Sequence, residues 1–325
     1  MNSSDPQFLH SFLLDGKGHG RPLDVLEVQE WTPADGLLWV HMDVADAPSG
    51  QWLKRDCGLP QIAVDALLAG DTRPRSAIEQ DGLLLILRGV NTNPGAYPED
   101  MVSVRVWIDE GRIITSQRRR LLSIEDVCEA LNAGKGPTTP GGFLVALVDR
   151  LANRIGGFVE SIEMEVDDCE EIITAGGEAG SRQQLGGLRR QIAEVRRFLA
   201  PQRDALDRLN RQTVAWLPES EAHDLRQEAD RITRLLEDLD LERERAVVLQ
   251  EELLSIVAQE QNKRMYVLSV VAAIFLPLTF VTGLLGMNVG GLPGVESPYA
   301  FTWSIAVMLV AGAALLLFFR FKKWF

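Results

Sequence analysis

Short apolar runs of β-like and helical character alternate over the first 135 residues of this 325-residue chain. The runs are LLWVHMDV (37–44), IAVDALLAG (62–70), LLLILRGV (83–90), VSVRVWID (102–109) and RIITSQ (112–117). The sequence DEG (109–111), between the last two runs, is typical of a hairpin turn. This pattern predicts a mixed α/β domain with a sheet over residues 1–135.

Helical patterns replace strand patterns after a Gly- and Pro-rich linker, GKGPTTPGG (134–142). We expect helices over residues 143–264, one from about 143 to 174, a second that ends near 215, and a third that begins at about Glu219. The third helix has no Pro or Gly before Pro277, so it would extend over roughly 90 Å.

Apolar residues seven positions apart run along the third helix and predict that it packs against partner helices. One heptad position is apolar throughout and another is mostly apolar: Leu225, Ile232, Leu239, Ala246 and Leu253, and then Glu228, Leu235, Glu242, Leu249 and Ile256. The partners could be the two preceding helices, copies of the same helix in an oligomer, or both.

Two uncharged apolar runs, 267–285 and 301–319, are each long enough to cross a membrane. A buried hairpin of a soluble protein is the alternative, but two such runs in succession are rare in soluble cores. The basic residues that flank the pair of runs are Lys263, Arg264, Arg320, Lys322 and Lys323, and none lies between the runs. The positive-inside rule therefore places both termini in the cytoplasm, and the N-terminal residues lack a secretory-signal pattern.

The predicted fold class is α+β, with a cytoplasmic α/β domain, long helices and two C-terminal transmembrane helices. The expected membrane region comprises a first span at 265–288, an outer loop at 289–299, a second span at 300–319 and a basic cytoplasmic end at 320–325.

A stripe of mostly small and hydroxyl side chains follows one side of the first span at steps of three or four residues. Its members are Met265, Ser269, Ala272, Leu276, Thr279, Gly283 and Gly286. Two spans cannot enclose a pore, so conduction would need several copies around an axis, with this stripe facing the axis. Helix packing is the alternative, because small residues also line interfaces between transmembrane helices.

Gly286, Met287 and Asn288 lie where the first span ends. Repeated around an axis, Asn288 would present a ring of amide oxygens that could bind the water shell of an ion. From these residues alone, a helix cap is the alternative role of Asn288. Glu296 is the only charged residue in the outer loop and would attract cations to the entrance, although a solvated loop carboxylate is the commoner case.

The chain carries a formal net charge of −13, which favours cations near its surface and disfavours nucleic acid as a partner. Seven acids fall within ESIEMEVDDCEE (160–171), and their repulsion must be offset by basic neighbours or by bound divalent cations. A solvated charged face is the alternative explanation of such a run. The candidate cation ligands are Glu163, Asp167, Asp168 and Glu171.

Motifs of tight metal sites and of enzymes are absent from the sequence. The four histidines and three cysteines show no zinc-ligand spacing, and no phosphate loop or nucleophile motif points to an enzyme. Between Met265 and Phe319 the only Asp, Glu or His is Glu296. The spans themselves therefore offer no side-chain proton carrier.

The Gly286-Met287-Asn288 sequence, at the end of the first of two C-terminal spans, resembles the Gly-Met-Asn signature of the CorA superfamily of divalent cation transporters. The acidic helical region, the long helix running into the first span and the basic, aromatic end RFKKWF (320–325) are similar too, so the resemblance covers the whole chain. Within the superfamily, residues 71–108 and GMNVGGLPG (286–294) resemble the zinc-transporting ZntB branch. Magnesium members carry an aromatic and an acidic residue where this chain has Val289 and Gly290.

This resemblance implies a funnel-shaped homopentamer in the bacterial inner membrane that transports zinc ions, by uptake and with coupling to protons, without a cofactor or enzymatic activity. It implies that Gly286, Met287 and Asn288 form a selectivity ring at the periplasmic entrance. Thr279 would form a hydroxyl ring further in, and Leu276 and Met265 would form apolar constrictions. A CorA-like channel for magnesium, cobalt, nickel or cadmium, zinc efflux, and a membrane-tethered scaffold or signalling protein are the alternatives.

Overall fold

The computed structural model describes residues 7–45, 47–177, 180–287 and 297–321. The chain divides into two compact units, Met1–Gln250 and Glu251–Phe325. Helix α7 (Glu219–Leu285) contributes residues to both units.

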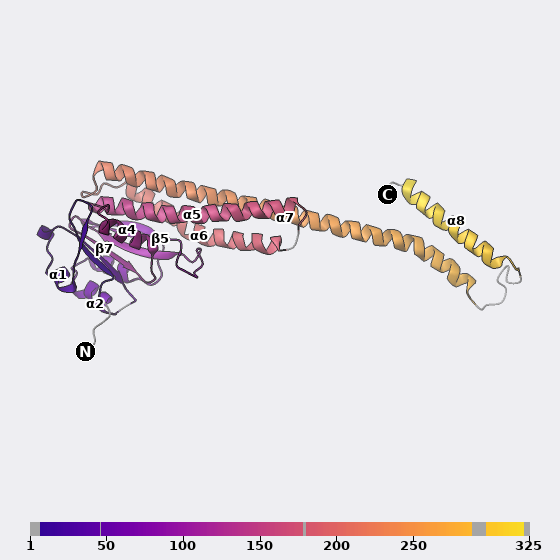
Figure 1. Ribbon diagram of the computed structural model, residues 1–325, viewed down its shortest axis with the longest axis horizontal. Coiled ribbons are helices and arrows are strands. Elements are labelled where there is room, and N and C mark those ends of the chain that lie inside the picture. Colours follow the sequence, from indigo (N-terminus) through magenta and orange to yellow (C-terminus); the bar gives the residue numbers. More distant parts are fainter. Residues whose placement is uncertain (1–6, 46, 178–179, 288–296, 322–325) are drawn as a thin grey trace. The chain divides into compact units, whose positions relative to one another are not determined.

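A seven-stranded mixed sheet forms the centre of the first unit (Figure 1). Its strand order is β2-β1-β3-β7-β6-β5-β4, and only the β3–β7 pair is parallel among the described strands. The strands are β1 (His10–Leu14), β2 (Gly20–Pro22), β3 (Leu37–Asp43), β4 (Arg75–Glu79), β5 (Gly82–Gly89), β6 (Val102–Ile108) and β7 (Arg112–Gln117). Together with the helices below, this sheet confirms the predicted α+β fold class.

The four runs that form β3, β5, β6 and β7 are almost wholly buried, which is why they are recognisable as apolar stretches. The run at 62–70 forms helix α3 (Gln61–Leu68) and so is a helical run between the strands, and residues 109–111 turn between β6 and β7 as predicted. Strands β1, β2 and β4 do not stand out in the sequence. They are short and partly polar, and their pairing partners define them more than their own composition does.

Helices cover both faces of the sheet (Figure 1). On one face, α1 (Val25–Glu30), α2 (Ala47–Arg55) and α3 bury a core that includes Val40, Met42 and Trp107. A short 3-10 turn, η1 (Pro33–Asp35), follows α1. On the other face, the rings of Trp39 in β3 and Phe143 in α5 (Pro140–Thr174) lie 4.8 Å apart between centroids. Helix α4 (Leu122–Asn132) packs beside α5, and α6 (Ser181–Asn210) packs against β4 and β5.

The long helices begin and end close to the predicted positions, with two differences. Helix α5 begins at Pro140, so the last three residues of the expected linker are helical, because Thr139 caps the helix and accepts a hydrogen bond from the Gly142 amide at 2.9 Å. Helix α6 ends at Asn210, about five residues earlier than expected. Helix α7 begins at Glu219 as predicted and continues through Pro277.

Helix α7 lies beside both preceding helices within the first unit. Its Asp240 pairs with Arg196 of α6 at 2.6 Å, and its Arg231 pairs with Asp149 of α5 at 3.3 Å. The heptad residues on this part of the helix are completely buried: Leu225, Ile232, Leu239 and Ala246. The preceding helices are therefore partners of α7, and further copies of the chain stay a prediction.

Candidate functional site

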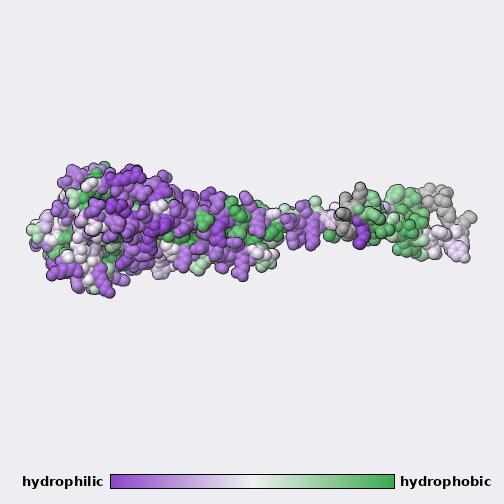
Figure 2. Space-filling model, turned by 90° about the horizontal axis from the view of Figure 1, so that it is seen from above, coloured by the Kyte–Doolittle hydropathy of each residue, from purple (hydrophilic) through white to green (hydrophobic). Residues whose placement is uncertain are grey.

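Among the residues that the structure describes, two helices are long and apolar enough to cross a membrane. They are α7, through its C-terminal part, and α8 (Ala300–Phe321). Figure 2 shows hydrophobic residues gathered over α8 and the C-terminal part of α7, whereas hydrophilic residues dominate the surface of the first unit. A lipid environment suits such a surface, because apolar side chains there need no cover by other parts of a protein.

The predicted stripe lies on one side of α7. Its steps of three and four residues average close to the 3.6 residues of a helical turn, and the helix is continuous from Met265 to Leu285. Gly286 follows directly, and its amide donates to the Thr282 carbonyl at 2.9 Å. Met265 and Leu276, the predicted constrictions, are 64% and 69% exposed in the single chain.

A cavity of about 920 Å³ lies between the end of α7 and α8 and marks the side of α7 that faces α8. Its lining includes Phe280, Thr282 and Leu284 of α7, with Phe301, Trp303 and Val307 of α8. None of the stripe residues from Met265 to Gly283 lines it. Beside α8, the stripe residues Thr279 and Gly283 therefore lie outside the cavity lining, whereas Gly286 at the end of the stripe belongs to it.

Two hydroxyl groups on the stripe differ in their hydrogen bonding. Ser269 donates its hydroxyl to the Met265 carbonyl of the same helix at 2.9 Å. The Thr279 hydroxyl forms no hydrogen bond with any residue that the structure describes, while the Thr279 carbonyl accepts from Thr282 Oγ1 at 3.0 Å. Thr279 can therefore offer its oxygen to a ligand or to water.

Pro277 lies within the predicted first span but is not among the predicted site residues. Proline lacks an amide hydrogen, so the carbonyl of Ala273 loses its usual helical donor within the predicted span. A carbonyl without its helical donor can be located from sequence alone, because it lies four residues before a proline within an apolar run. Asn288 and Glu296 lie outside the described residues, so their predicted roles at the entrance stay predictions.

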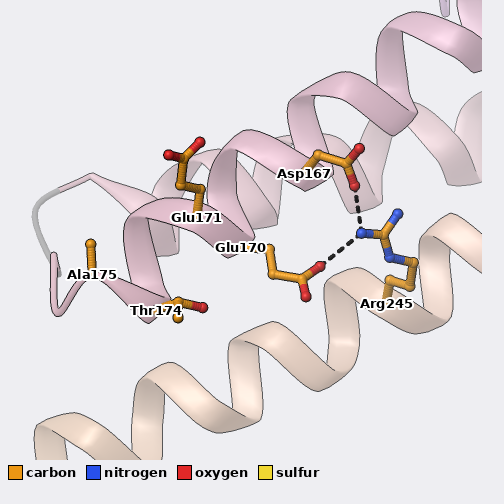
Figure 3. A pocket seen from close by; sticks show the side chains of 6 residues that line it. All are labelled: Asp167, Glu170, Glu171, Thr174, Ala175 and Arg245. Carbon is orange, nitrogen blue, oxygen red and sulfur yellow. Dashed lines mark hydrogen bonds and ion pairs between the residues drawn. The ribbon is translucent and has the colours of Figure 1, made fainter.

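The acidic run of α5 meets a single arginine of α7 (Figure 3). Arg245 Nη2 lies 2.5 Å from Asp167 Oδ1 and 2.7 Å from Glu170 Oε2, and Arg245 Nη1 lies 3.1 Å from Glu242 Oε2. The carboxylates of Asp167 and Glu170 accept hydrogen bonds from Arg245 and raise its pKa. Burial raises the pKa of Glu242 despite the opposing charge of Arg245.

Of the seven acids in the run, Asp167 and Glu170 thus form ion pairs with a basic neighbour, Arg245. Glu171 points away from Arg245 (Figure 3), and Glu163 and Asp168 are exposed. Over residues 7–45, 47–177, 180–287 and 297–321, no three His, Cys, Asp or Glu side chains are grouped as a metal ion requires. A cation site made of Glu163, Asp167, Asp168 and Glu171 stays a prediction.

Strand pairing brings together two histidines that are distant in the sequence. His10 of β1 pairs with His41 of β3, and their rings stack with centroids 6.0 Å apart. His41 is buried, its Nδ1 lies 2.8 Å from Thr115 Oγ1, and burial lowers its pKa to about 3. A neutral, buried imidazole of this kind belongs to the core, and only the β1–β3 register reveals the pair.

Comparison with known proteins gives matches over nearly the whole chain. Residues 34–323 match the family described as "CorA-like Mg²⁺ transporter protein". The chain is 40% identical over 319 residues to the "Divalent cation transporter CmaX" of Pseudomonas aeruginosa, a match that covers 97% of this chain and 95% of the relative. It is 34% identical over 318 residues to the "Zinc transport protein ZntB" of Pectobacterium carotovorum, with the same two coverages.

Solved structures support the same relationship. The structure of the full-length CmaX protein has a TM-score of 0.87 at 38% identity and covers 99% of this chain and 100% of that one. The complete structure of the CorA magnesium transporter from Methanocaldococcus jannaschii has a TM-score of 0.83, covers all of both chains and is 19% identical, which shows a shared fold. This chain belongs to the family of CorA-like Mg²⁺ transporter proteins.

Proposed function

We propose that this protein transports divalent metal cations across the bacterial inner membrane and that Zn²⁺ is its cargo. The observation that carries the proposal is the stripe of α7: its Thr279 and Gly283 do not line the cavity beside α8, and the Thr279 hydroxyl has no hydrogen-bond partner among the described residues. The near full-length identity to proteins named as divalent cation and zinc transporters supports it.

The pore requires several copies of the chain, because two spans cannot enclose a path by themselves. A closed ring of identical subunits, in our proposal a homopentamer, would turn the stripe of each copy toward a common axis. The side of α7 that faces α8 would then lie away from that axis. In this arrangement both termini are cytoplasmic, in keeping with the basic residues that flank the two spans.

The ion would pass mainly hydrated. In our proposal Gly286, Met287 and Asn288 form the outer ring, where amide oxygens accept hydrogen bonds from the water shell of the ion. Thr279 provides a second ring of oxygens, and Leu276 and Met265 form apolar constrictions that stop flow when they lose water. Glu296, one carboxylate per copy, would raise the cation concentration at the entrance.

Zinc is favoured over magnesium by the residues that follow Asn288 and by the names of several relatives. Val289 and Gly290 differ from the pattern of magnesium members, and relatives at 32–34% identity are named zinc transport proteins. The relative at 40% identity is named a divalent cation transporter. A broader divalent cation channel is therefore the second candidate. Our proposal includes two further parts: Zn²⁺ moves into the cell, and its movement is coupled to that of protons.

The test is metal entry into liposomes that contain the purified protein, measured for Zn²⁺ and Mg²⁺ with and without a pH gradient. Asn288→Ala should reduce Zn²⁺ flux by at least about tenfold, the factor that corresponds to about 1.4 kcal/mol of lost ion stabilisation. Thr279→Val should also reduce flux. Thr282→Val is the matched control, because Thr282 lines the cavity beside α8 and its hydroxyl bonds to its own helix.

Each outcome bears on a separate part of the proposal. Absence of any metal flux would contradict transport and favour a membrane-tethered scaffold. Equal fluxes of Zn²⁺ and Mg²⁺ would contradict zinc selectivity and favour a channel for a broad range of divalent cations. Equal effects of Thr279→Val and Thr282→Val would show that the stripe does not line the pore. Zinc flux that ignores the pH gradient would remove proton coupling alone.

A further inference from the structure

A cavity of about 940 Å³ lies in the first unit, at the end of the sheet where two hairpins turn. The β4–β5 hairpin turns at Gln80 and Asp81, and the β6–β7 hairpin turns at residues 109–111. The two turns are neighbours, because Leu83 of β5 pairs with Ile108 of β6. We name this cavity the Trp31 pocket, and the residues used below are Trp31, Gln80, Asp81, Trp107, Glu110 and Arg112.

Two indole rings form apolar surface in the Trp31 pocket. Trp31 is half-buried, and its Nε1 donates to the Gly36 carbonyl at 3.1 Å, which fixes the ring. Trp107 also lines the pocket and is buried, and its Nε1 donates to Asp109 Oδ2 at 3.0 Å. A Cβ atom on Gly82 would lie only 2.1 Å from Cζ2 of Trp107, so glycine is required there to seat the ring.

The charges of the pocket do not balance. Arg112 Nε donates to Asp109 Oδ2 at 2.8 Å, and Asp109 Oδ1 accepts from the backbone amides of Gly111 and Arg112. This pair neutralises itself. Asp81 and Glu110 are exposed and form no side-chain hydrogen bond or ion pair within the described parts of the chain. Two carboxylates without a partner among the described residues therefore line the same pocket as the half-buried ring of Trp31.

Gln80, on the rim of the pocket, has a strained backbone. Its φ is 55°, and it is the one non-glycine residue with positive φ among the residues that the structure describes. Glycine would adopt this conformation at no steric cost. The two-residue turn of the β4–β5 hairpin calls for a positive φ at its first position, and glutamine supplies there a side-chain amide that glycine would lack. The amide of Gln80 can donate to or accept from a ligand in the pocket.

We propose that the Trp31 pocket binds an organic cation that carries a guanidinium or alkylammonium group. The apolar part of the ligand would lie on Trp31, since aromatic faces attract such cations, and Asp81 and Glu110 would balance its charge. A metal ion fits less well, because the described residues group no three metal-ligating side chains here. The cation could be a free small molecule or the side chain of a basic segment in another protein.

Calorimetric titration of the full-length protein in detergent micelles tests the proposal with matched probes. The peptide N-acetyl-Gly-Arg-Gly-amide should bind, and the same peptide with neutral citrulline in place of arginine should bind at least about tenfold more weakly. Agmatine, which carries the guanidinium without a peptide, distinguishes the two sources. Tighter binding of the peptide assigns a protein segment, and tighter binding of agmatine assigns a free cation.

Variants of exposed residues separate pocket binding from general attraction to an acidic protein. Asp81→Asn and Glu110→Gln should each weaken binding of the tighter probe by about 2- to 5-fold. Glu129→Gln, which removes an exposed carboxylate of α4 outside the pocket, should leave binding unchanged. Equal weakening by Glu129→Gln, equal binding of the citrulline peptide, or no binding of either cation would overturn the proposal.

Gln80→Gly gives a readout that a purely structural role would not produce. The substitution should relieve backbone strain and raise the apparent melting temperature by about 2–4 °C. It should weaken binding of the cation at the same time, because the amide is lost. Unchanged binding in a stabilised Gln80→Gly protein would show that the strain serves no ligand at this pocket.

Discussion

Arg245 holds together three carboxylates that would otherwise repel one another. Asp167 and Glu170 come from α5 and Glu242 from α7, and all three lie within 3.1 Å of the guanidinium. Glu242 is the most buried of the three, with 5% of its side chain exposed. The group therefore ties two long helices together at a point where acidic residues dominate both.

Removal of the guanidinium should destabilise the first unit. Arg245→Met leaves the three carboxylates unpaired, and we expect the free energy of unfolding to fall by about 1–2 kcal/mol. The apparent melting temperature should fall by about 2–6 °C. Differential scanning fluorimetry measures it, with Arg243→Met as control because Arg243 is exposed and has no ion pair among the described residues. Equal losses in the two variants would contradict a specific role of Arg245.

Glu228 provides a test of pH dependence. Burial raises the pKa of Glu228 and Asp149 adds to this shift, which outweighs the opposing charge of Arg231, whose Nη1 lies 3.7 Å from Glu228 Oε2. The folded protein therefore binds a proton at higher pH than the unfolded chain. The contribution of Glu228 to stability increases as pH falls toward 4.5, its ordinary value, and is lost as pH rises through the raised pKa.

Glu228→Gln should consequently be more stable than the natural protein at pH 8, and this difference should shrink as pH falls toward 4.5. Melting temperatures measured across this range test the expectation. Glu237→Gln is the control, because Glu237 is exposed on the same helix. A difference that grows as pH falls would have the wrong sign.

At the scale of elements, the start of α7 is connected to the start of α5. The Thr139 hydroxyl hydrogen bonds to Glu221 of α7, and a Cβ atom on Gly141 would lie 2.0 Å from Glu221 Oε2 and 2.6 Å from Leu217 Cδ1. A carboxylate at a helix N-terminus interacts favourably with the helix dipole. Gly141 leaves the space that this contact needs.

Two glycines of α5 should respond in opposite ways to alanine. Gly141→Ala should lower the free energy of unfolding by about 1–3 kcal/mol, because the added methyl group displaces Glu221. Gly157 is exposed, with nothing within 4 Å of an added Cβ, so Gly157→Ala should raise it by about 0.5–1 kcal/mol through helix propensity. Thermal melting of both variants tests the pair. A stable Gly141→Ala protein would show that Glu221 moves aside at little cost.

At the scale of the whole molecule, the two-span topology makes a prediction about chemical accessibility. In intact cells, a membrane-impermeant maleimide should label Ser297→Cys, which precedes α8 on the proposed outer side. Lys323→Cys should be labelled only after the membrane is permeabilised. The maleimide should not label the natural cysteines, because all three are buried and burial raises the pKa of Cys128 to about 12. Labelling of Lys323→Cys in intact cells would contradict cytoplasmic termini.

The central strands, the long helices and the two spans could be predicted because each has a local pattern. Strands β3, β5, β6 and β7 are apolar runs, and α7 has heptad spacing without Pro or Gly before Pro277. The edge strands β2 and β4 could not be predicted in this way, since they depend on pairing with β1 and β5.

Some features of the candidate site could likewise be predicted from local patterns, and others depend on tertiary contacts. Spacing alone placed Met265, Leu276 and Thr279 on one side of a helix, because helical periodicity is a property of the chain itself. The position of α8 beside Phe280, Thr282 and Gly286 depends on how two helices pack. Whether the Thr279 hydroxyl has a hydrogen-bond partner within the described part of the chain depends on which acceptors lie near it.

The sequence by itself therefore determined the central strands, the long helices, the apolar spans and the order of the stripe, because local periodicity and composition encode them. The tertiary structure decided which distant groups meet. Arg105, a charged residue in the centre of strand β6, is buried, and its Nη2 donates to the carbonyls of Ala69 and Gly70, which follow α3. The tertiary structure likewise decides that Arg245 meets its carboxylates and that Trp31 lies near two hairpin turns. Contacts between segments far apart in the chain leave no local pattern in the sequence.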